Sequence, residues 1–135
     1  MHFEQTSKLT HRTTLKMLEA AVAKADEIGQ PQCIVIVDAS GETLGQIRMN
    51  GAKFLSLKSA RTKARTAASI GAPSDNIPTE VGLEIAAATG GDMTRLGGGL
   101  PIYDAENLVG GIGVGSGSPE QDKEVATAAL NAIGV

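Results

Sequence analysis

Basic side chains concentrate in one stretch of this chain, where they indicate a binding function. Half of the twelve lysines and arginines fall between positions 48 and 65, and no aspartate or glutamate lies among them. They are Arg48, Lys53, Lys58, Arg61, Lys63 and Arg65. A local excess of positive charge attracts anions, and charge-assisted hydrogen bonds to carboxylates or phosphates are strong. The stretch predicts a site for a small anionic ligand; a solvated helix face paired with acids from elsewhere is the alternative.

Helical spacing places a hydroxyl group beside one of these basic side chains. Lys63 and Thr66 fall on one stripe of the helix expected here, so an amine and an alcohol would face the same way. We expect replacement of Lys63 or Arg48 to weaken ligand binding and replacement of Lys58 to matter little. If the protein is an enzyme, Lys63 and Asp122 are the candidates for acid–base catalysis and Arg48 for an anion clamp. The sequence leaves open whether it is an enzyme.

The glycine-rich stretch at 110–117 invites comparison with nucleotide-binding loops, but its spacing does not match them. Neither G-x-G-x-x-G nor a glycine loop followed by Lys-Ser/Thr occurs there. A strand and turn that admit close backbone approach explain the glycines better. The start of the helix that follows is a further candidate for holding an anion.

Histidine and cysteine offer little support for a metal centre. His11 lies early in the first expected helix, where it is either a surface residue or a candidate haem ligand. Cys33 is the sole cysteine and sits in an apolar run, which predicts a buried, inert thiol. The motifs of zinc and serine hydrolases are missing from the sequence.

The elements that must position these residues follow from apolar periodicity and from turn residues. A first helix includes residues 15–28, and further helices are expected over residues 53–70, 78–88 and 119–133. Strands are expected over residues 33–37, 43–49, 93–96, 100–103 and 108–114. Short hairpin connections predict an antiparallel five-stranded sheet flanked by helices, an α/β fold of the α+β type.

Composition bounds the fold and the partners. The 135 residues fit one domain, residues 1–135, and the net charge of −3 argues against a nucleic-acid partner. The sequence contains neither a membrane-length apolar run nor a secretory signal pattern, so a cytoplasmic protein without a membrane partner is expected. A small-residue face at Ala60, Ala64, Ala67 and Ala68, with few large side chains elsewhere, predicts a homo-oligomer.

Six short motifs in a fixed order carry a resemblance to a known family. They are Val37-Asp38-x-x-Gly41, Arg48-Met49-Asn50-Gly51-Ala52, Ala60-x-x-Lys63-Ala64-x-Thr66-Ala67, Gly98-Gly99-x-Pro101-Ile102, Gly110-Gly111-Ile112-Gly113-Val114-Gly115-x-Gly117 and Glu120-Gln121-Asp122. The series resembles the GlcG/HbpS-like haem-binding family, which includes the C-terminal domain of PduO-type proteins.

The resemblance implies a profilin-like sandwich that forms a dimer or a higher assembly such as an octamer. It also implies haem as cofactor, bound or handled in a pocket between the cationic helix and the glycine-rich strand. There Thr66 would approach the iron, while Lys63, Arg48 and Arg61 would meet the propionates. Gly98, Gly99 and Gly113 would complete this site. The alternative is an enzyme of a catabolic pathway that acts on an anionic substrate in the same pocket without haem.

Overall fold

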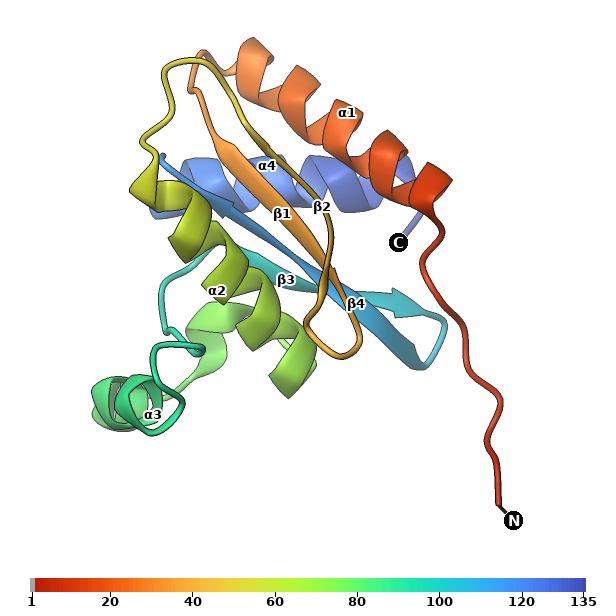
Figure 1. The fold of residues 1–135 in the computed structure, drawn as a ribbon. Helices are drawn as coiled ribbons and strands as arrows, with labels where there is room; N and C mark the ends of the chain where they lie inside the picture. Colours follow the sequence, from red (N-terminus) through yellow and green to blue (C-terminus); the bar gives the residue numbers. More distant parts are fainter. Residues whose placement is uncertain (1) are drawn as a thin grey trace.

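A computed structural model describes residues 2–135, which form four helices and four strands (Figure 1). In chain order the elements are α1 (His11–Glu27), β1 (Cys33–Asp38), β2 (Thr43–Arg48), α2 (Leu55–Ile70), α3 (Gly82–Ala88), β3 (Gly99–Asp104), β4 (Asn107–Gly115) and α4 (Pro119–Ala132). Two 3-10 turns, Ser74–Asn76 and Thr79–Val81, connect α2 to α3. Every helix within residues 2–135 is too short or too polar to span a lipid bilayer.

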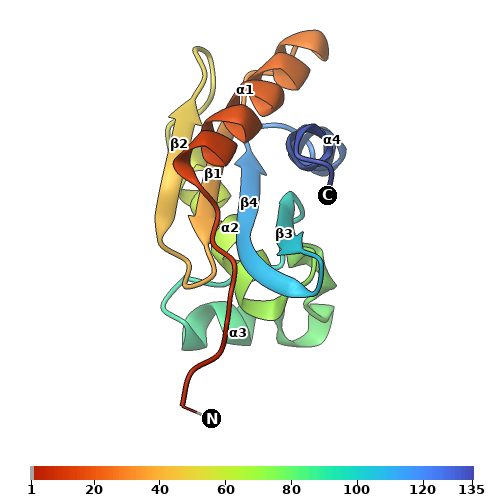
Figure 2. The ribbon, with the colours of Figure 1, turned by 90° about the vertical axis from the view of Figure 1, so that its right-hand side faces the viewer.

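The four strands form one antiparallel sheet in the order β2-β1-β4-β3. Helices α1 and α4 cover one face and α2 covers the other, which gives three layers (Figure 2). Side chains alternate across β1 accordingly. Ile34 and Ile36 join the core beneath α1 and α4, whereas Val35 and Val37 join the core beneath α2.

The layer under α2 is thin because both surfaces carry small residues. A Cβ added to Gly113 would lie 1.9 Å from the carbonyl oxygen of Ala60, and one added to Gly111 would lie 2.4 Å from that of Ala64. Helix and strand backbones therefore touch directly. The expectation that the glycine-rich strand admits close backbone approach is confirmed.

Helix ends follow the sequence signals closely. Ser118 caps α4 by accepting a hydrogen bond from the backbone N–H of Gln121, and the Gln121 side chain accepts one from the backbone N–H of Ser118, which completes the expected capping box. Gly71 closes α2 in the left-handed conformation at φ 67°. Helix α2 begins at Leu55, two residues later than expected, and the helix expected from Pro78 is a 3-10 turn followed by α3.

Two expectations about the architecture are wrong. The sheet has four strands, because residues 93–96 form a loop whose Met93 and Thr94 amides donate to threonine hydroxyls instead of to a strand. The small-residue face of α2 is not free for a second copy, because it is buried against the chain's own sheet. The mixed α/β class and the antiparallel sheet flanked by helices are confirmed; the profilin-like classification stays a prediction.

Candidate functional site

Lys63 and Asp122 form a buried ion pair where α2, β4 and α4 meet. The Lys63 ammonium donates to Asp122 Oδ2 at 2.9 Å and to the carbonyl oxygen of Val114 at 2.9 Å. The other carboxylate oxygen, Oδ1, accepts the backbone N–H of Gly117 at 3.0 Å. The two charged side chains are 6% and 3% exposed. The two residues expected to act as acid and base are thus brought together, but each neutralises the other.

Two of the three glycines expected in the site pack against Lys63, and the third packs against α2. A Cβ at Gly98 would lie 2.9 Å from Asp122 Cβ and 3.2 Å from Lys63 Nζ, and Gly98 has φ +118°. A Cβ at Gly99 would meet the Lys63 carbonyl oxygen at 2.3 Å, and Gly113 is against α2 as described above. All three are buried, so the structure uses these positions for close packing.

Thr66 is fully buried one turn after Thr62 on α2, beneath the Thr94 segment, and its hydroxyl is engaged twice. It donates to the Thr62 carbonyl oxygen at 2.8 Å and accepts the backbone N–H of Thr94 at 3.0 Å. It shares the buried side of the helix with Lys63, as expected, but each hydroxyl or amine is directed to its own protein partners. A ligand role for Thr66 would require the Thr94 segment to move.

The remaining expected cations lie on the surface. Arg48 ends β2 opposite Cys33, and Arg61 lies on the outer side of α2; both are exposed. Because α2 and β4 are in backbone contact, the pocket expected between the cationic helix and the glycine-rich strand is not formed. The space between α2 and β4 is therefore closed to a ligand.

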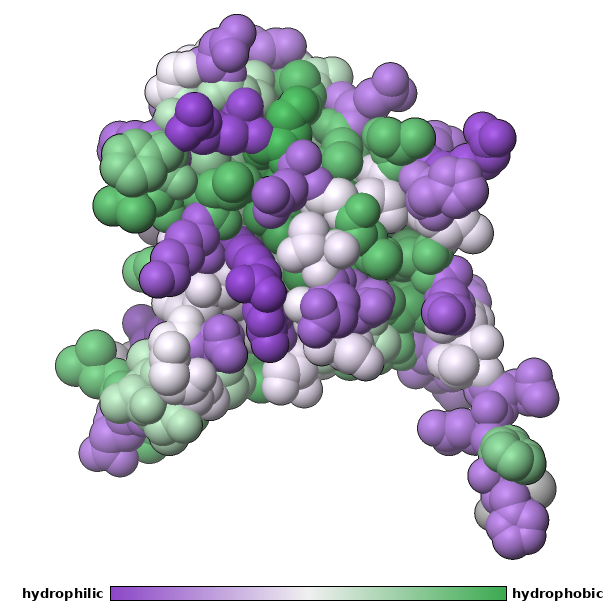
Figure 3. Space-filling model, viewed as in Figure 1, coloured by the Kyte–Doolittle hydropathy of each residue, from purple (hydrophilic) through white to green (hydrophobic). Residues whose placement is uncertain are grey.

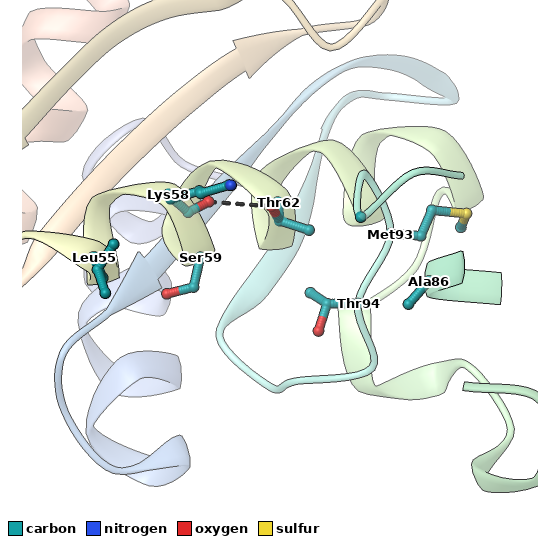
Figure 4. A pocket seen from close by; sticks show the side chains of 8 residues that line it. Leu55, Lys58, Ser59, Thr62, Ala86, Met93 and Thr94 are labelled. Carbon is teal, nitrogen blue, oxygen red and sulfur yellow. Dashed lines mark hydrogen bonds between the residues drawn. The ribbon is translucent and has the colours of Figure 1, made fainter. Parts of the chain in front are cut away.

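A groove of about 350 Å³ lies between α2, α3 and the loop at residues 91–94. Apolar walls come from Leu55, Ala86 and Met93, and polar groups from Lys58, Ser59, Thr62 and Thr94 (Figure 4); Gly91 completes the lining. Its volume lies in the range of small-molecule sites. We call this the α2–α3 groove.

The α2–α3 groove combines an apolar surface with a cation and several hydroxyls. Lys58 is exposed and supplies its positive charge, while Phe54 and Leu55 are 69% and 67% exposed beside it. Apolar surface gathers over this start of α2 (Figure 3). Such a surface suits a flat, largely apolar ligand that carries carboxylates. Sequence reasoning missed the groove, although positions 55, 58, 59 and 62 share one helical stripe and could have indicated it.

A second groove, of about 660 Å³, lies between α1 and β2. Its apolar lining includes Leu15, Val22 and Ile47, and its acidic groups are Glu19 and Asp26. The charge beside it is therefore opposite to that of the α2–α3 groove. A ligand with carboxylates would be repelled here and attracted there, so charge decides between the two grooves where volume alone would favour the second.

Neither Cys33 nor His11 belongs to the α2–α3 groove. Cys33 is fully buried on β1 under α2, and this burial raises the pKa of its thiol, which keeps it neutral. His11 is the exposed first residue of α1, on the other face of the sheet. No cluster of His, Cys, Asp and Glu residues that could hold a metal ion occurs within residues 2–135.

Comparison with known proteins places the chain in a family. Residues 9–131 match the model described as "Haem degrading protein HbpS-like". Over 98% of the chain, 32% of residues are identical to the corrinoid adenosyltransferase PduO of Citrobacter freundii, of whose length the alignment covers 41%. The crystal structure of ORFY from Klebsiella pneumoniae superposes with a TM-score of 0.91 at 29% identity, covering 98% of this chain and 95% of that one. The structure of a PduOC:heme complex superposes with a TM-score of 0.89 at 29% identity, covering 96% and 97%.

Proposed function

Because the chain belongs to the HbpS-like family of haem-degrading proteins, we propose that it binds or handles haem, with the α2–α3 groove as its binding site. One observation carries the choice of groove. Of the two apolar grooves described above, this one has an ammonium group beside its apolar wall, and the other has two carboxylates. The similar PduOC structure, which was solved with haem, supports the choice of ligand.

The residues present fit the chemistry of haem. Leu55, Ala86 and Met93 offer apolar contact for the porphyrin plane, and Lys58 offers a charged hydrogen bond for a propionate. Iron, when bound, supplies ligand exchange and one-electron chemistry. The chain's part is to exclude water from one side of the porphyrin and to hold the propionates at the rim of the groove.

In this proposal Lys58 binds the propionate, the role that the resemblance assigned to Lys63, Arg48 and Arg61. Lys63 is committed to Asp122, and the groove has no contribution from Arg48. An exposed ammonium-to-carboxylate contact contributes up to about 1 kcal/mol, and it weakens with salt. Arg61, exposed three residues further along α2, is not among the residues that line the groove.

The alternative of an enzyme without haem has less support from the structure. It relied on Lys63 and Asp122 as acid and base, and these groups are buried and paired with each other. The chain also spans only about two fifths of the adenosyltransferase that it resembles, so that activity is not proposed for it. A homo-oligomer and a cytoplasmic location stay predictions.

Titration with ferric haem tests the proposal, with two variants that each place a ring in one of the two grooves. Ala86→Phe places a ring in the α2–α3 groove, and Ala23→Phe places the same ring in the groove between α1 and β2. We expect the unmodified protein to bind haem to saturation, Ala86→Phe to weaken binding at least tenfold, and Ala23→Phe to bind like the unmodified protein.

A charge-reversal variant tests the proposed haem site independently. Lys58→Glu should weaken haem binding, and the effect should shrink at high salt, because the lost contact lies at the surface. Lys16→Glu on the exposed face of α1 makes the same charge change elsewhere and should have little effect. Saturable binding that is lost in Ala23→Phe and kept in Ala86→Phe would refute the choice of groove, and no binding by the unmodified protein would refute the function.

A further inference from the structure

Two threonines hold one wall of the α2–α3 groove in the same way. The Thr66 hydroxyl, on α2, accepts the backbone N–H of Thr94 at 3.0 Å, and the Thr89 hydroxyl, at the end of α3, accepts the backbone N–H of Met93 at 3.1 Å. Each hydroxyl also donates to a carbonyl oxygen four residues earlier in the chain, that of Thr62 at 2.8 Å or of Ile85 at 2.8 Å. The consecutive backbone amides of Met93 and Thr94 are thus hydrogen-bonded to the end of α3 and to α2, respectively.

These bonds matter because α3 has little else to fix it. It has no buried residue, and among the helices and strands of residues 2–135 it contacts only the neighbouring 3-10 turn Thr79–Val81. Leu83 on α3 is 89% exposed. A short helix without core contacts is held by its connections, and the 93–94 segment is the connection whose amides bond both to α2 and to the end of α3.

We infer that Thr66 and Thr89 are positioning residues, which set the width of the α2–α3 groove by fixing Met93 and Thr94 between its two helices. The inference rests on the proposed function for its ligand, and it gives Thr66 a role other than binding iron. Met93, Thr94 and Thr62 line the groove, whereas Thr66 lies behind them with no exposed surface. Thr66 would thus influence a bound porphyrin through the backbone at Thr94.

We call the two hydrogen bonds from the Thr94 and Met93 amides to the Thr66 and Thr89 hydroxyls the clamp. The clamp depends on one chemical property of Thr66. A hydroxyl is required and a methyl group is not, so Thr66→Ser should keep the clamp, whereas the isosteric Thr66→Val should open it. Thr89→Val should have the same effect from the other helix. Thr14→Val is the matched control, since the Thr14 hydroxyl is buried in α1 and donates to the Thr10 carbonyl oxygen but captures no distant amide.

The first measurement is amide hydrogen exchange without haem. Thr66→Val should speed exchange of the Thr94 amide about tenfold, and Thr89→Val that of the Met93 amide, because each amide loses a hydrogen bond. The second is ferric haem titration. We expect both valine variants to bind about five- to tenfold more weakly with an unchanged absorption spectrum of the complex, and Thr66→Ser and Thr14→Val to behave like the unmodified protein.

The outcomes separate this inference from the proposed function. Unchanged exchange at Met93 and Thr94 in the valine variants would overturn the clamp, and so would a Thr66→Val complex with an altered spectrum but unaltered exchange, which would identify Thr66 as an iron ligand. If the unmodified protein binds no haem, the proposed function fails, and the exchange experiment still decides whether the clamp exists. Weaker haem binding by Thr66→Ser than by the unmodified protein would also contradict the inference.

Discussion

Removal of one member of the Lys63–Asp122 pair should destabilise the protein strongly. At 2.9 Å and an effective dielectric constant of about 20, the attraction of the two charges is about 6 kcal/mol. Removing both charges from water costs several kcal/mol per ion, so the intact pair contributes little net stability. Removal of one partner leaves the other charge buried and unpaired, however, which costs about 3–5 kcal/mol. A small domain has about 5–15 kcal/mol of total stability.

Urea denaturation followed by circular dichroism measures this effect. Lys63→Met and Asp122→Leu should each lower the free energy of unfolding by about 3–5 kcal/mol, and the double variant should recover most of the loss, because it leaves no unpaired charge. Lys24→Met removes one partner of a surface pair with Glu124 and should change stability little. Additive losses in the double variant, or single losses below about 1 kcal/mol, would refute the reasoning.

Three further predictions follow from packing and assembly. Gly113→Ala should lower the urea midpoint far more than Gly29→Ala, because the first Cβ would lie 1.9 Å from an Ala60 oxygen, whereas the second meets nothing within 4 Å and costs only about 1–2 kcal/mol for its left-handed φ of +68°; equal midpoints would contradict this. Cys33 should react with iodoacetamide only when the chain is unfolded, because burial raises the pKa of its thiol; alkylation of the native protein at the unfolded rate would disprove it. The resemblance to the family still predicts a homo-oligomer, although the alanine face of α2 does not form its interface, and only monomer in sedimentation at micromolar concentration would contradict it.

Much of the fold could be predicted because its signals are local. Apolar periodicity indicated α1 and α2, β-branched residues indicated β1, and Ser118 with Gln121 marked the start of α4. The prediction of a fifth strand was wrong because the Met93 and Thr94 amides donate to threonine hydroxyls, one 4 residues away and the other 28 residues away, and not to a neighbouring strand. Hydrogen bonds to Thr66 leave no trace in the pattern of the segment itself.

The candidate site was harder to predict, because charge in a sequence does not show which cations are already paired. Lys63 stood out as a ligand-binding residue, yet its partner Asp122 lies 59 residues away. The alanine face of α2 indicated a tight contact correctly, but the contact is with Gly111 and Gly113 of the same chain. Lys58 was predicted to be an ordinary surface residue. The groove beside it depends on α3, which is distant from Lys58 in the sequence and forms the opposite wall.

The central claim, that haem lies in the α2–α3 groove, is tested most directly by nuclear magnetic resonance. Ferric haem broadens the signals of nearby amides through its unpaired electrons, and zinc protoporphyrin serves as the diamagnetic reference. We predict that ferric haem broadens the amides of Ser59, Thr62 and Thr94 selectively. Broadening centred on Ile47, in the groove between α1 and β2, or on His11 would contradict the account.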